Sequence, residues 1–338
     1  MNPAGVLRQI ALYLERGGAP TYRVRAFRRA ASVVEGLSRE ELERRAAEGT
    51  LTELSGIGKT TANVIGEALE GREPAYLTEV AGGAENLPDG GALLTALRGD
   101  CHTHSDWSDG GSSIEEMAEA ARELGHEYIV LTDHSPRLTV ARGLSAERLR
   151  RQLEVVAGLN TAYESEGSPF RVLTGIEVDI LQDGSLDQEP DLLAELDIVV
   201  ASVHSHLRME RNRMTERMVT AVSNPHVDVL GHCTGRLVTG RGRPESEFDP
   251  DAVFGACRAN DVAVEINSRP ERLDPPLRLL RTARELGCRF AIDTDAHAPG
   301  QLGWQPYGCA RALDCGIGAG DVVNTMTSEG LLAWARGD

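Results

Sequence analysis

The sequence has few features that would place it outside an ordinary reducing, aqueous compartment. Its six cysteines include no Cys-x-x-Cys pair, so we expect free, mostly buried thiols rather than a disulfide framework. No run of about 18 apolar residues occurs, and no membrane span is predicted. The first five residues lack the basic and then apolar pattern of a signal peptide, so the expected location is cytoplasmic.

Lysine is almost absent, and acidic residues are in excess. Lys59 is the only lysine among 35 basic residues, against 52 acidic ones, and the formal net charge is −17. Residues 1–72 carry +2, so the remainder carries −19. This acidic remainder argues against non-specific nucleic-acid binding through its surface, although it permits a phosphate substrate if cations line the site. With 338 residues, the chain is long enough for one large domain and one small one.

The first 72 residues have the periodicity of a small helical domain. Apolar residues at positions 7, 10, 11 and 14, and again at 27, 30, 31 and 34, indicate two amphipathic helices. Ser38 and Glu41 are typical of the capped start of a third helix. Arg25, Arg28 and Arg29 lie on the polar side of the second helix, which gives this region a cluster of positive charge.

A hairpin with the sequence Leu-Ser-Gly-Ile-Gly-Lys follows at 54–59. Gly56 and Gly58 allow a tight turn, and backbone N–H groups at the start of the next helix can hold a phosphate oxygen. The hairpin and the stretch 22–30 resemble the helix-hairpin-helix module of polymerase beta and the bacterial family X DNA polymerases. The resemblance implies sequence-independent contact with a DNA backbone, with Lys59 and the arginines supplying charge. The alternative is a helical interaction domain in which the glycines only turn the chain.

Residues 73–97 are expected to form a linker between this module and a domain over 98–338. The Gly-Gly and Pro-Asp-Gly-Gly sequences in this segment favour irregular structure. The segment is too short for a nucleotidyl-transfer domain, so we do not expect a polymerase. In polymerase beta the hairpin helix also carries a lysine for lyase chemistry, and Val64 stands at that position, so lyase activity through this residue is not expected.

From residue 98 onward, one pattern recurs seven times: a short apolar run, a polar residue able to bind metal, and then a helix-like stretch. His102 and His104, two residues apart on an extended segment, point to the same side. The later runs lead into His134, Glu177, His204, His232, Glu265 with Asn267, and the stretch from Asp293 to His297. Because parallel strands collect such side chains at one face of a barrel, the sequence predicts an α/β fold with a seven-stranded (β/α)7 barrel. An open doubly wound sheet is the alternative.

These motifs resemble those of the PHP (polymerase and histidinol phosphatase) domain over nearly all of residues 98–338. Gly-Asp-Cys-His-Thr-His-Ser, Leu-Thr-Asp-His, Gly-Ile-Glu-Val-Asp, Ser-Val-His-Ser, Leu-Gly-His and Thr-Asp-Ala-His occur in the family order. The stretch 265–274 is most similar to the PHP domain of bacterial family X polymerases. The resemblance implies a distorted TIM-like barrel with three metal ions.

The resemblance also assigns nine ligands to these ions. His102, His104, Glu177 and Asp295 would hold the first ion and form the catalytic core; Glu177, His204 and His232 would hold the second; Asp109, His134 and His297 would hold the third. Spacing alone indicates only one cluster. Imidazole and carboxylate ligands favour Zn, Mn or Fe over Mg.

Three divalent ions on three carboxylates would leave a net charge of +3, which attracts phosphate into an acidic domain. Paired metals about 3.5–4 Å apart can activate water and stabilise charge on phosphorus, so no protein nucleophile is required. Arg236 and Arg269 are candidates to bind the substrate phosphate, with ordinary surface salt bridges as the alternative. Glu265 and Asn267 are candidates to orient the ligand imidazoles.

Taken together, these features predict a metal-dependent phosphoesterase that acts on DNA ends, as a 3′–5′ exonuclease or a 3′-end phosphatase in DNA repair. One alternative is a small-molecule phosphomonoesterase of the histidinol-phosphatase type that uses the helical module for protein contacts. Another is a DNA-binding scaffold in which the metals only stabilise the barrel. The sequence assigns no oligomeric state.

Overall fold

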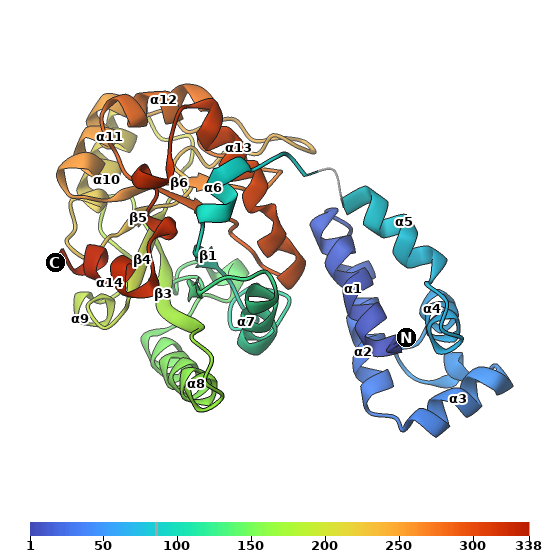
Figure 1. Cartoon of the computed structure of the whole chain (residues 1–338). Coiled ribbons are helices and arrows are strands. Elements are labelled where there is room, and N and C mark those ends of the chain that lie inside the picture. The colour runs from blue at the N-terminus through green and yellow to red at the C-terminus, as the bar shows by residue number, and fades with distance from the viewer. Residues whose placement is uncertain (85–86, 338) are drawn as a thin grey trace. The chain divides into compact units, whose positions relative to one another are not determined.

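The computed structural model describes residues 1–84 and 87–337, and the chain forms two compact units, Met1–Leu87 and Pro88–Asp338 (Figure 1). The first unit is helical, and the second contains a parallel sheet surrounded by helices. Within the described ranges, we find no helix with the length and apolarity needed to cross a bilayer.

The N-terminal unit is a bundle built on the predicted amphipathic helices. Ser38 accepts a hydrogen bond from the Glu41 N–H at 3.2 Å, so the predicted cap is confirmed. Leu7, Ile10 and Ile65 are fully buried in its core. Its helices are α1 (Pro3–Arg16), α2 (Thr21–Glu35), α3 (Arg39–Glu48), the 3-10 turn η1 (Leu51–Glu53), α4 (Lys59–Leu69) and α5 (Ala75–Ala84).

The segment expected to be a linker, 73–97, contains two helices instead, α5 and α6 (Gly91–Ala96). The Tyr76 ring of α5 stacks on Phe27 with centroids 5.2 Å apart, and Leu77 joins the core of the N-terminal unit. Leu93 of α6 belongs to the core of the second unit. The expectation gave too much weight to the glycines, because burial of these apolar side chains stabilises both helices.

The second unit is a nearly closed barrel of seven parallel strands, as far as the described residues extend. The strands follow one another in the order β1 to β7. Between the last and first strands, Thr103 and Ala296 form an isolated parallel bridge, and the His104 N–H donates to the Ala296 carbonyl at 2.8 Å. The predicted (β/α)7 barrel is confirmed.

The elements of this unit, after α6, alternate strand and helix. They are β1 (Gly99–Thr103), α7 (Ile114–Glu123), β2 (Tyr128–Leu131), η2 (Thr139–Ala141), α8 (Ala146–Ser165), β3 (Arg171–Asp179), α9 (Pro190–Leu193), β4 (Ile198–Ser202), α10 (Arg211–Val222), β5 (Val229–Leu230), α11 (Pro250–Ala259), β6 (Ala263–Asn267), α12 (Leu277–Glu285), β7 (Phe290–Asp293), η3 (Pro299–Trp304), α13 (Gln305–Asp314), η4 (Ala319–Asp321), η5 (Val323–Thr325) and α14 (Ser328–Arg336).

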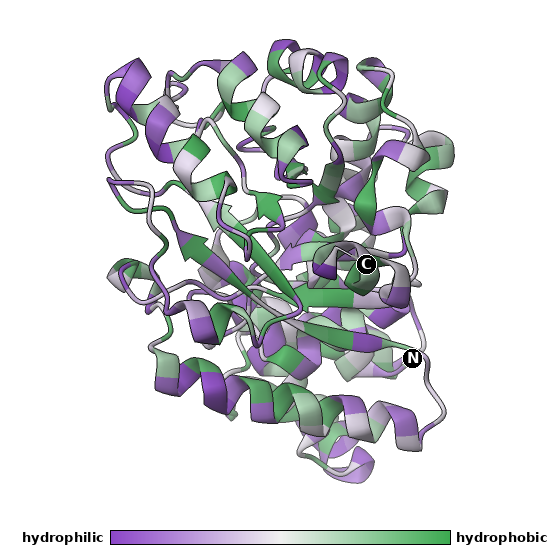
Figure 2. Ribbon diagram, turned by 90° about the vertical axis from the view of Figure 1, so that its left-hand side faces the viewer, coloured by the Kyte–Doolittle hydropathy of each residue, from purple (hydrophilic) through white to green (hydrophobic). Residues whose placement is uncertain are grey.

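Burial on both faces explains why these strands are continuous apolar runs. Every residue of β1, β2, β4 and β6 is buried, as expected for a parallel sheet covered by helices. The strands in the middle of Figure 2 are mostly hydrophobic, and the surrounding helices alternate hydrophobic and hydrophilic residues. Helix α7, for example, buries Ile114, Met117 and Ala121. The six cysteines are free and buried, which confirms that expectation.

One partly buried carboxyl gives the barrel a pH-dependent stability. Asp228, just before β5, accepts a hydrogen bond from the Val199 N–H at 2.7 Å, and burial raises the pKa of Asp228 to about 7. An unfolded aspartate has a pKa of about 3.9, so between about pH 4 and pH 7 the folded state binds a proton that the unfolded chain releases. Stability from this group therefore falls as pH rises through that window, and the loss is complete above pH 7.

We expect Asp228→Asn to remove this loss, because an amide oxygen still accepts from Val199 and carries no charge. Relative to the unaltered protein, the variant should gain about 2–3 kcal/mol more unfolding free energy at pH 8 than at pH 5. Urea denaturation at the two pH values measures the difference. Asp314→Asn, on the exposed surface, is the control. An equal effect of Asp228→Asn at both pH values would contradict the prediction.

Candidate metal centre

The residues predicted to bind metal converge at the carboxyl ends of the strands, around Glu177 of β3. The Glu177 carboxylate is buried and lies close to imidazoles carried by four other strand ends. The Glu177 Oε2 atom lies 3.3 Å from His102 Nε2, 3.5 Å from His104 Nε2 and 2.8 Å from His134 Nδ1. The Oε1 atom lies 3.1 Å from His204 Nε2 and 2.9 Å from His232 Nε2.

These contacts have the chemistry of a metal site rather than of a hydrogen-bond network. Both Glu177 oxygens, and the Nε2 atoms of His102, His104, His204 and His232, are buried without a hydrogen-bond partner among the described residues. Leaving that many buried polar atoms unsatisfied is costly. Two ligand atoms on one tetrahedral ion with bonds of about 2.1 Å lie about 3.4 Å apart, similar to the distances found here. The residues therefore fit bound divalent cations.

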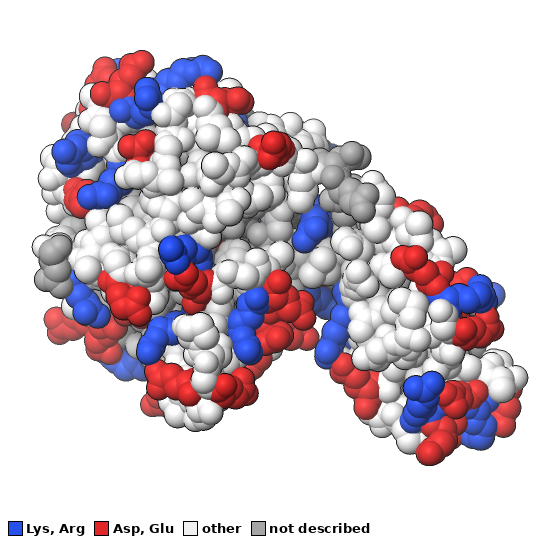
Figure 3. Space-filling model, viewed as in Figure 1, with Lys and Arg blue, Asp and Glu red and all other residues white. Residues whose placement is uncertain are grey.

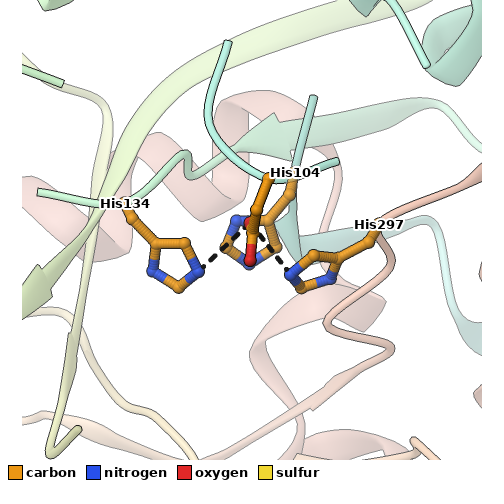
Figure 4. A group of neighbouring side chains, drawn as sticks. His104, His134 and His297 are labelled. Atoms are coloured by element: carbon orange, nitrogen blue, oxygen red, sulfur yellow. Dashed lines mark ion pairs between the residues drawn. The ribbon is translucent and has the colours of Figure 1, made fainter. Parts of the chain in front are cut away.

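His104, His134 and His297 lie close together (Figure 4), and Asp109, on the loop after β1, joins them in a second part of the cluster. Asp109 Oδ1 lies 3.5 Å from His134 Nε2 and 3.2 Å from His297 Nε2. The His104 ring lies between the two parts, with its centroid 4.1 Å from that of His297. The structure thus brings the three side chains proposed for the third ion together, and it also places His134 against Glu177.

Asp295, after β7, completes the set of nine. Its Oδ1 atom lies 3.4 Å from His104 Nε2, on the side expected for the first ion. Burial by itself would raise the pKa of Glu177, but the surrounding imidazoles of His204, His134 and His102 hold it well below its usual range. Burial would likewise raise the pKa of Asp295, but the nearby Arg272 guanidinium holds that pKa well below its usual range. Both carboxylates are therefore ionised, as cation ligands must be.

Carboxylates behind the cluster fix the orientation of its imidazoles. Glu265 of β6 bonds to His102 Nδ1 at 2.6 Å through one oxygen and accepts from the His232 N–H at 2.6 Å through the other. Asn267 donates to both Glu265 and Asp295 at 3.3 Å. The predicted positioning partners are thus in contact with the ligands, where such groups raise metal affinity.

The sequence analysis missed Asp179, which has the same relation to His204. Asp179 Oδ1 accepts from the His204 N–H at 3.1 Å and lies 3.3 Å from its Nδ1. Because Asp179 stands two residues after Glu177 on β3, alternation along the strand places both side chains on one face. The sequence signal was present in the Gly-Ile-Glu-Val-Asp motif.

The arginine predictions had different outcomes. Arg269 lies in the metal pocket, with Nη1 3.0 Å from the Asp295 carbonyl and 3.1 Å from His297 Nδ1. Arg272, which the sequence analysis did not select, lines the same pocket of about 450 Å³ with Nε 3.1 Å from Asp295 Oδ2. Arg236 donates to the carbonyls of Arg272 and Leu273 and lines a neighbouring pocket. Arg236 is not among the described residues that line the metal pocket.

Two arginines hold the loop that carries Asp109. Arg142 donates to the Asp106 carbonyl at 3.0 Å and to the Ser108 carbonyl, and Arg148 donates to the Trp107 carbonyl. Three successive carbonyls are thereby bound by guanidinium groups from Arg142, the residue after η2, and from Arg148 of α8. The position of Asp109 beside His134 and His297 therefore depends on cations that come from another segment of the chain.

We expect the double variant Arg142→Gln, Arg148→Gln to release this loop and weaken the third site. Metal analysis after exhaustive dialysis should show about one ion per chain fewer than in the unaltered protein, because loss of an orienting partner lowers affinity about 10–100-fold. Arg150→Gln and Arg151→Gln on the exposed side of α8 are matched controls. An unchanged metal content in the double variant would show that the loop is held by other contacts.

The DNA-binding candidates of the N-terminal unit fall into two groups. Arg29 lies at the hairpin and donates to Ser55 Oγ at 3.1 Å, and Arg25 and Lys59 are exposed. Arg28 instead pairs with Glu15 at 2.9 Å, and the Glu15 side chain is only 4% exposed, so this arginine stabilises the bundle.

One of the two hairpin glycines, Gly56, is required by the geometry of the turn. Gly56 has a φ of +103°, and a Cβ atom there would lie 2.9 Å from Arg29 Cγ. Gly58 is the N-cap of α4, and its N–H donates to Thr61 Oγ1 at 2.9 Å. On the face that carries α3, acidic and basic side chains are interspersed (Figure 3), and Glu41 there pairs with Arg44 and Arg45. The hairpin and its arginine are therefore better placed for an anionic backbone than α3.

Comparison with known proteins agrees with this geometry. A family model described as the PHP domain matches residues 100–269, which is half of the chain. The chain belongs to the PHP family. A second model, the helix-hairpin-helix domain, matches residues 2–74, so this PHP protein also carries that module.

Curated relatives include two kinds of protein. The DNA polymerase/3′-5′ exonuclease PolX of Bacillus subtilis is 46% identical over 204 residues, which are 60% of this chain and 35% of PolX. This PHP protein thus spans about a third of the length of that relative. A probable phosphatase of a Thermoanaerobacter species is 30% identical over 240 residues, covering 67% of this chain and 89% of that protein.

A solved structure of histidinol phosphate phosphatase from Lactococcus lactis, complexed with zinc, L-histidinol and phosphate, matches with a TM-score of 0.46 and 18% identity. The match covers 66% of this chain and 94% of the solved chain. The family assignment and the curated relatives identify the protein as a PHP-type phosphoesterase.

Proposed function

We propose that this PHP protein hydrolyses phosphate esters at the 3′ ends of DNA, as a 3′–5′ exonuclease or as a 3′-end phosphatase. The observation that carries the chemistry is the single buried Glu177 carboxylate within 3.5 Å of five imidazole nitrogens. The helix-hairpin-helix match and the similarity to PolX support DNA as the substrate. A non-catalytic scaffold would need neither the full ligand set nor the open pocket beside it.

Three divalent ions of Zn, Mn or Fe, when bound, would supply Lewis acidity toward the phosphate and lower the pKa of a bound water. Glu177 would hold two of these ions together, with His102, His104 and Asp295 on one side and His204 and His232 on the other. Asp109, His134 and His297 would hold the third. Glu265 and Asp179 keep the imidazoles in the required orientation through the contacts described above.

Arg269 and Arg272 are the groups of this chain that we assign to the substrate phosphate. Both line the metal pocket, and both are anchored by Asp295, so their guanidinium groups are held in place before substrate arrives. Planar guanidinium groups suit the oxygens of a phosphate. The ring of Trp304 lies against Arg269, with the guanidinium carbon 5.8 Å from the centroid, and further restricts it.

The test uses the purified, Mn-loaded protein and a 5′-labelled duplex with a recessed strand that ends in a 3′-hydroxyl or a 3′-phosphate. A ladder of shortened products would establish an exonuclease, and loss of the 3′-phosphate alone would establish an end-processing phosphatase. Glu177→Ala is the inactive control.

The similarity to a probable phosphatase over 89% of its length favours a second candidate, a small-molecule phosphomonoesterase. If neither DNA strand changes while histidinol phosphate or an aryl phosphate is hydrolysed, the DNA proposal fails. The small-molecule function would then replace it.

A further inference from the structure

A second pocket, of about 590 Å³, lies beside the metal pocket and is lined by arginines. The side chains come from the start of α10, the segment after β5, and α12, and these helices lie along one side of the barrel (Figure 1). Its charged lining is Arg211, Arg236, Arg243, Arg278, Glu245 and Glu247. Four cations thus face two anions in a part of the chain that is otherwise strongly acidic.

The two pockets share a wall. Leu237 lines both of them, and it pairs with Arg243 through backbone hydrogen bonds of 2.9 and 3.0 Å. The Val238 N–H donates to the Glu271 carbonyl at 2.7 Å, and Arg236 Nε donates to the Arg272 carbonyl at 3.1 Å. The arginine-lined pocket is therefore fastened to the same backbone segment that presents Arg272 to the metal pocket.

The cations of this pocket are only partly compensated. Arg236 and Arg278 share one carboxylate, Glu245, and Arg211 pairs with Asp249 at 3.3 Å. Burial and the neighbouring Arg272 lower the pKa of Arg243. The side chains of Arg211 and Arg278 are 48% and 64% exposed, so an anion can reach them from solvent.

We propose that this pocket is a subsite for a second phosphate of a nucleic-acid strand whose terminal phosphate ester occupies the metal pocket. The inference rests on the proposed action on DNA and specifies how a DNA strand is distinguished from a small phosphate ester. A strand carries phosphates at regular intervals, so it can occupy both pockets, whereas a small phosphomonoester can fill only one. The acidic surface elsewhere would repel a strand, and the arginines would direct it along this side.

The experiment measures inhibition of aryl-phosphate hydrolysis by the full-length Mn-loaded protein. One inhibitor is a single-stranded 8-mer with a hydrolysis-resistant 3′ phosphorothioate linkage, and the other is a nucleoside monophosphate. In the double variant Arg211→Gln, Arg278→Gln, we expect the inhibition constant of the 8-mer to rise roughly tenfold and its salt dependence to fall by roughly 0.7 log units per lost phosphate contact. The inhibition constant of the monophosphate should change less than about twofold, because one phosphate does not reach the second pocket.

Arg289→Gln is the matched control, since Arg289 pairs with Asp261 on the barrel surface and lies outside both pockets. The proposal is overturned if the double variant and the control shift the 8-mer equally. It is also overturned if the 8-mer binds the unaltered protein no better than the monophosphate. A strand that inhibits through the arginines but is not cleaved in the end-processing assay would refute the proposed function and leave the subsite standing.

Discussion

Glu177→Gln is expected to reduce phosphoesterase activity by at least about 10³-fold and to lower the metal content of the purified protein. The amide has the size of the carboxylate but carries no charge and offers one acceptor oxygen instead of two. In the unaltered protein, five imidazoles face the Glu177 carboxylate. Ions bound on either side of this carboxylate would lose their common ligand in the variant. Kinetics on an aryl phosphate and elemental analysis of the same sample measure both effects.

Glu164→Gln is the control for this substitution, because Glu164 is an exposed glutamate near the end of α8 that pairs with Arg171, at the start of β3 and six residues before Glu177. Circular dichroism should show the same helix content in both variants. Retention of full activity and metal by Glu177→Gln would remove the basis for placing the reaction at this carboxylate.

Removal of residues 1–87 is expected to raise the KM for DNA about 10–100-fold while kinetics on small phosphates are retained. The structure determines where the cut belongs. Cutting after residue 72 would leave Tyr76 and Leu77 of α5 without the core they pack in, whereas cutting after residue 87 keeps α6, whose Leu93 is buried in the barrel core. The salt dependence of DNA cleavage should fall with the lost phosphate contacts.

A full-length variant separates the hairpin from the rest of the N-terminal unit. Arg29→Gln with Lys59→Gln removes two cations at the hairpin, and Arg39→Gln removes one from the exposed face of α3, where it pairs with Glu43. The first variant should reproduce part of the rise in KM, and the second should not. If neither the truncation nor the hairpin variant alters DNA cleavage, the module serves another partner.

The sequence was most informative where one short element carries both the fold and the chemistry. Each apolar run ending in a histidine or a carboxylate proved to be a strand, because burial on both faces of a parallel sheet requires apolar residues and its carboxyl ends open into one pocket. Eight of the nine predicted ligand positions lie together for this reason, and the ninth, Asp109, is brought to them by the loop after β1. Their division among three ions followed from family resemblance, and the contact between His134 and Glu177 shows that distance alone does not divide them.

Features that depend on long side chains from distant segments were not predictable. Arg142, Arg148 and Arg272 reach backbone carbonyls or carboxylates through flexible stems, and nothing in their local sequence indicates the target. Arg28 and Arg236 each have a partner within the protein that the sequence did not reveal. The helices within 73–97 were missed because glycine and proline frequencies report local backbone preference and not tertiary burial.

The seam between β7 and β1 affects the order in which this protein becomes functional. His104 comes just after β1 and His297 just after β7, so these two ligands lie on opposite sides of the seam. The Gly111 N–H donates to the His297 carbonyl at 2.7 Å across this seam. Ligands from the first and last strands therefore meet only after the intervening chain has been synthesised and folded. A chain that ended before residue 297 would lack His297 and could not form the complete cluster. The complete set of predicted metal ligands therefore exists only in a barrel that has closed between β7 and β1.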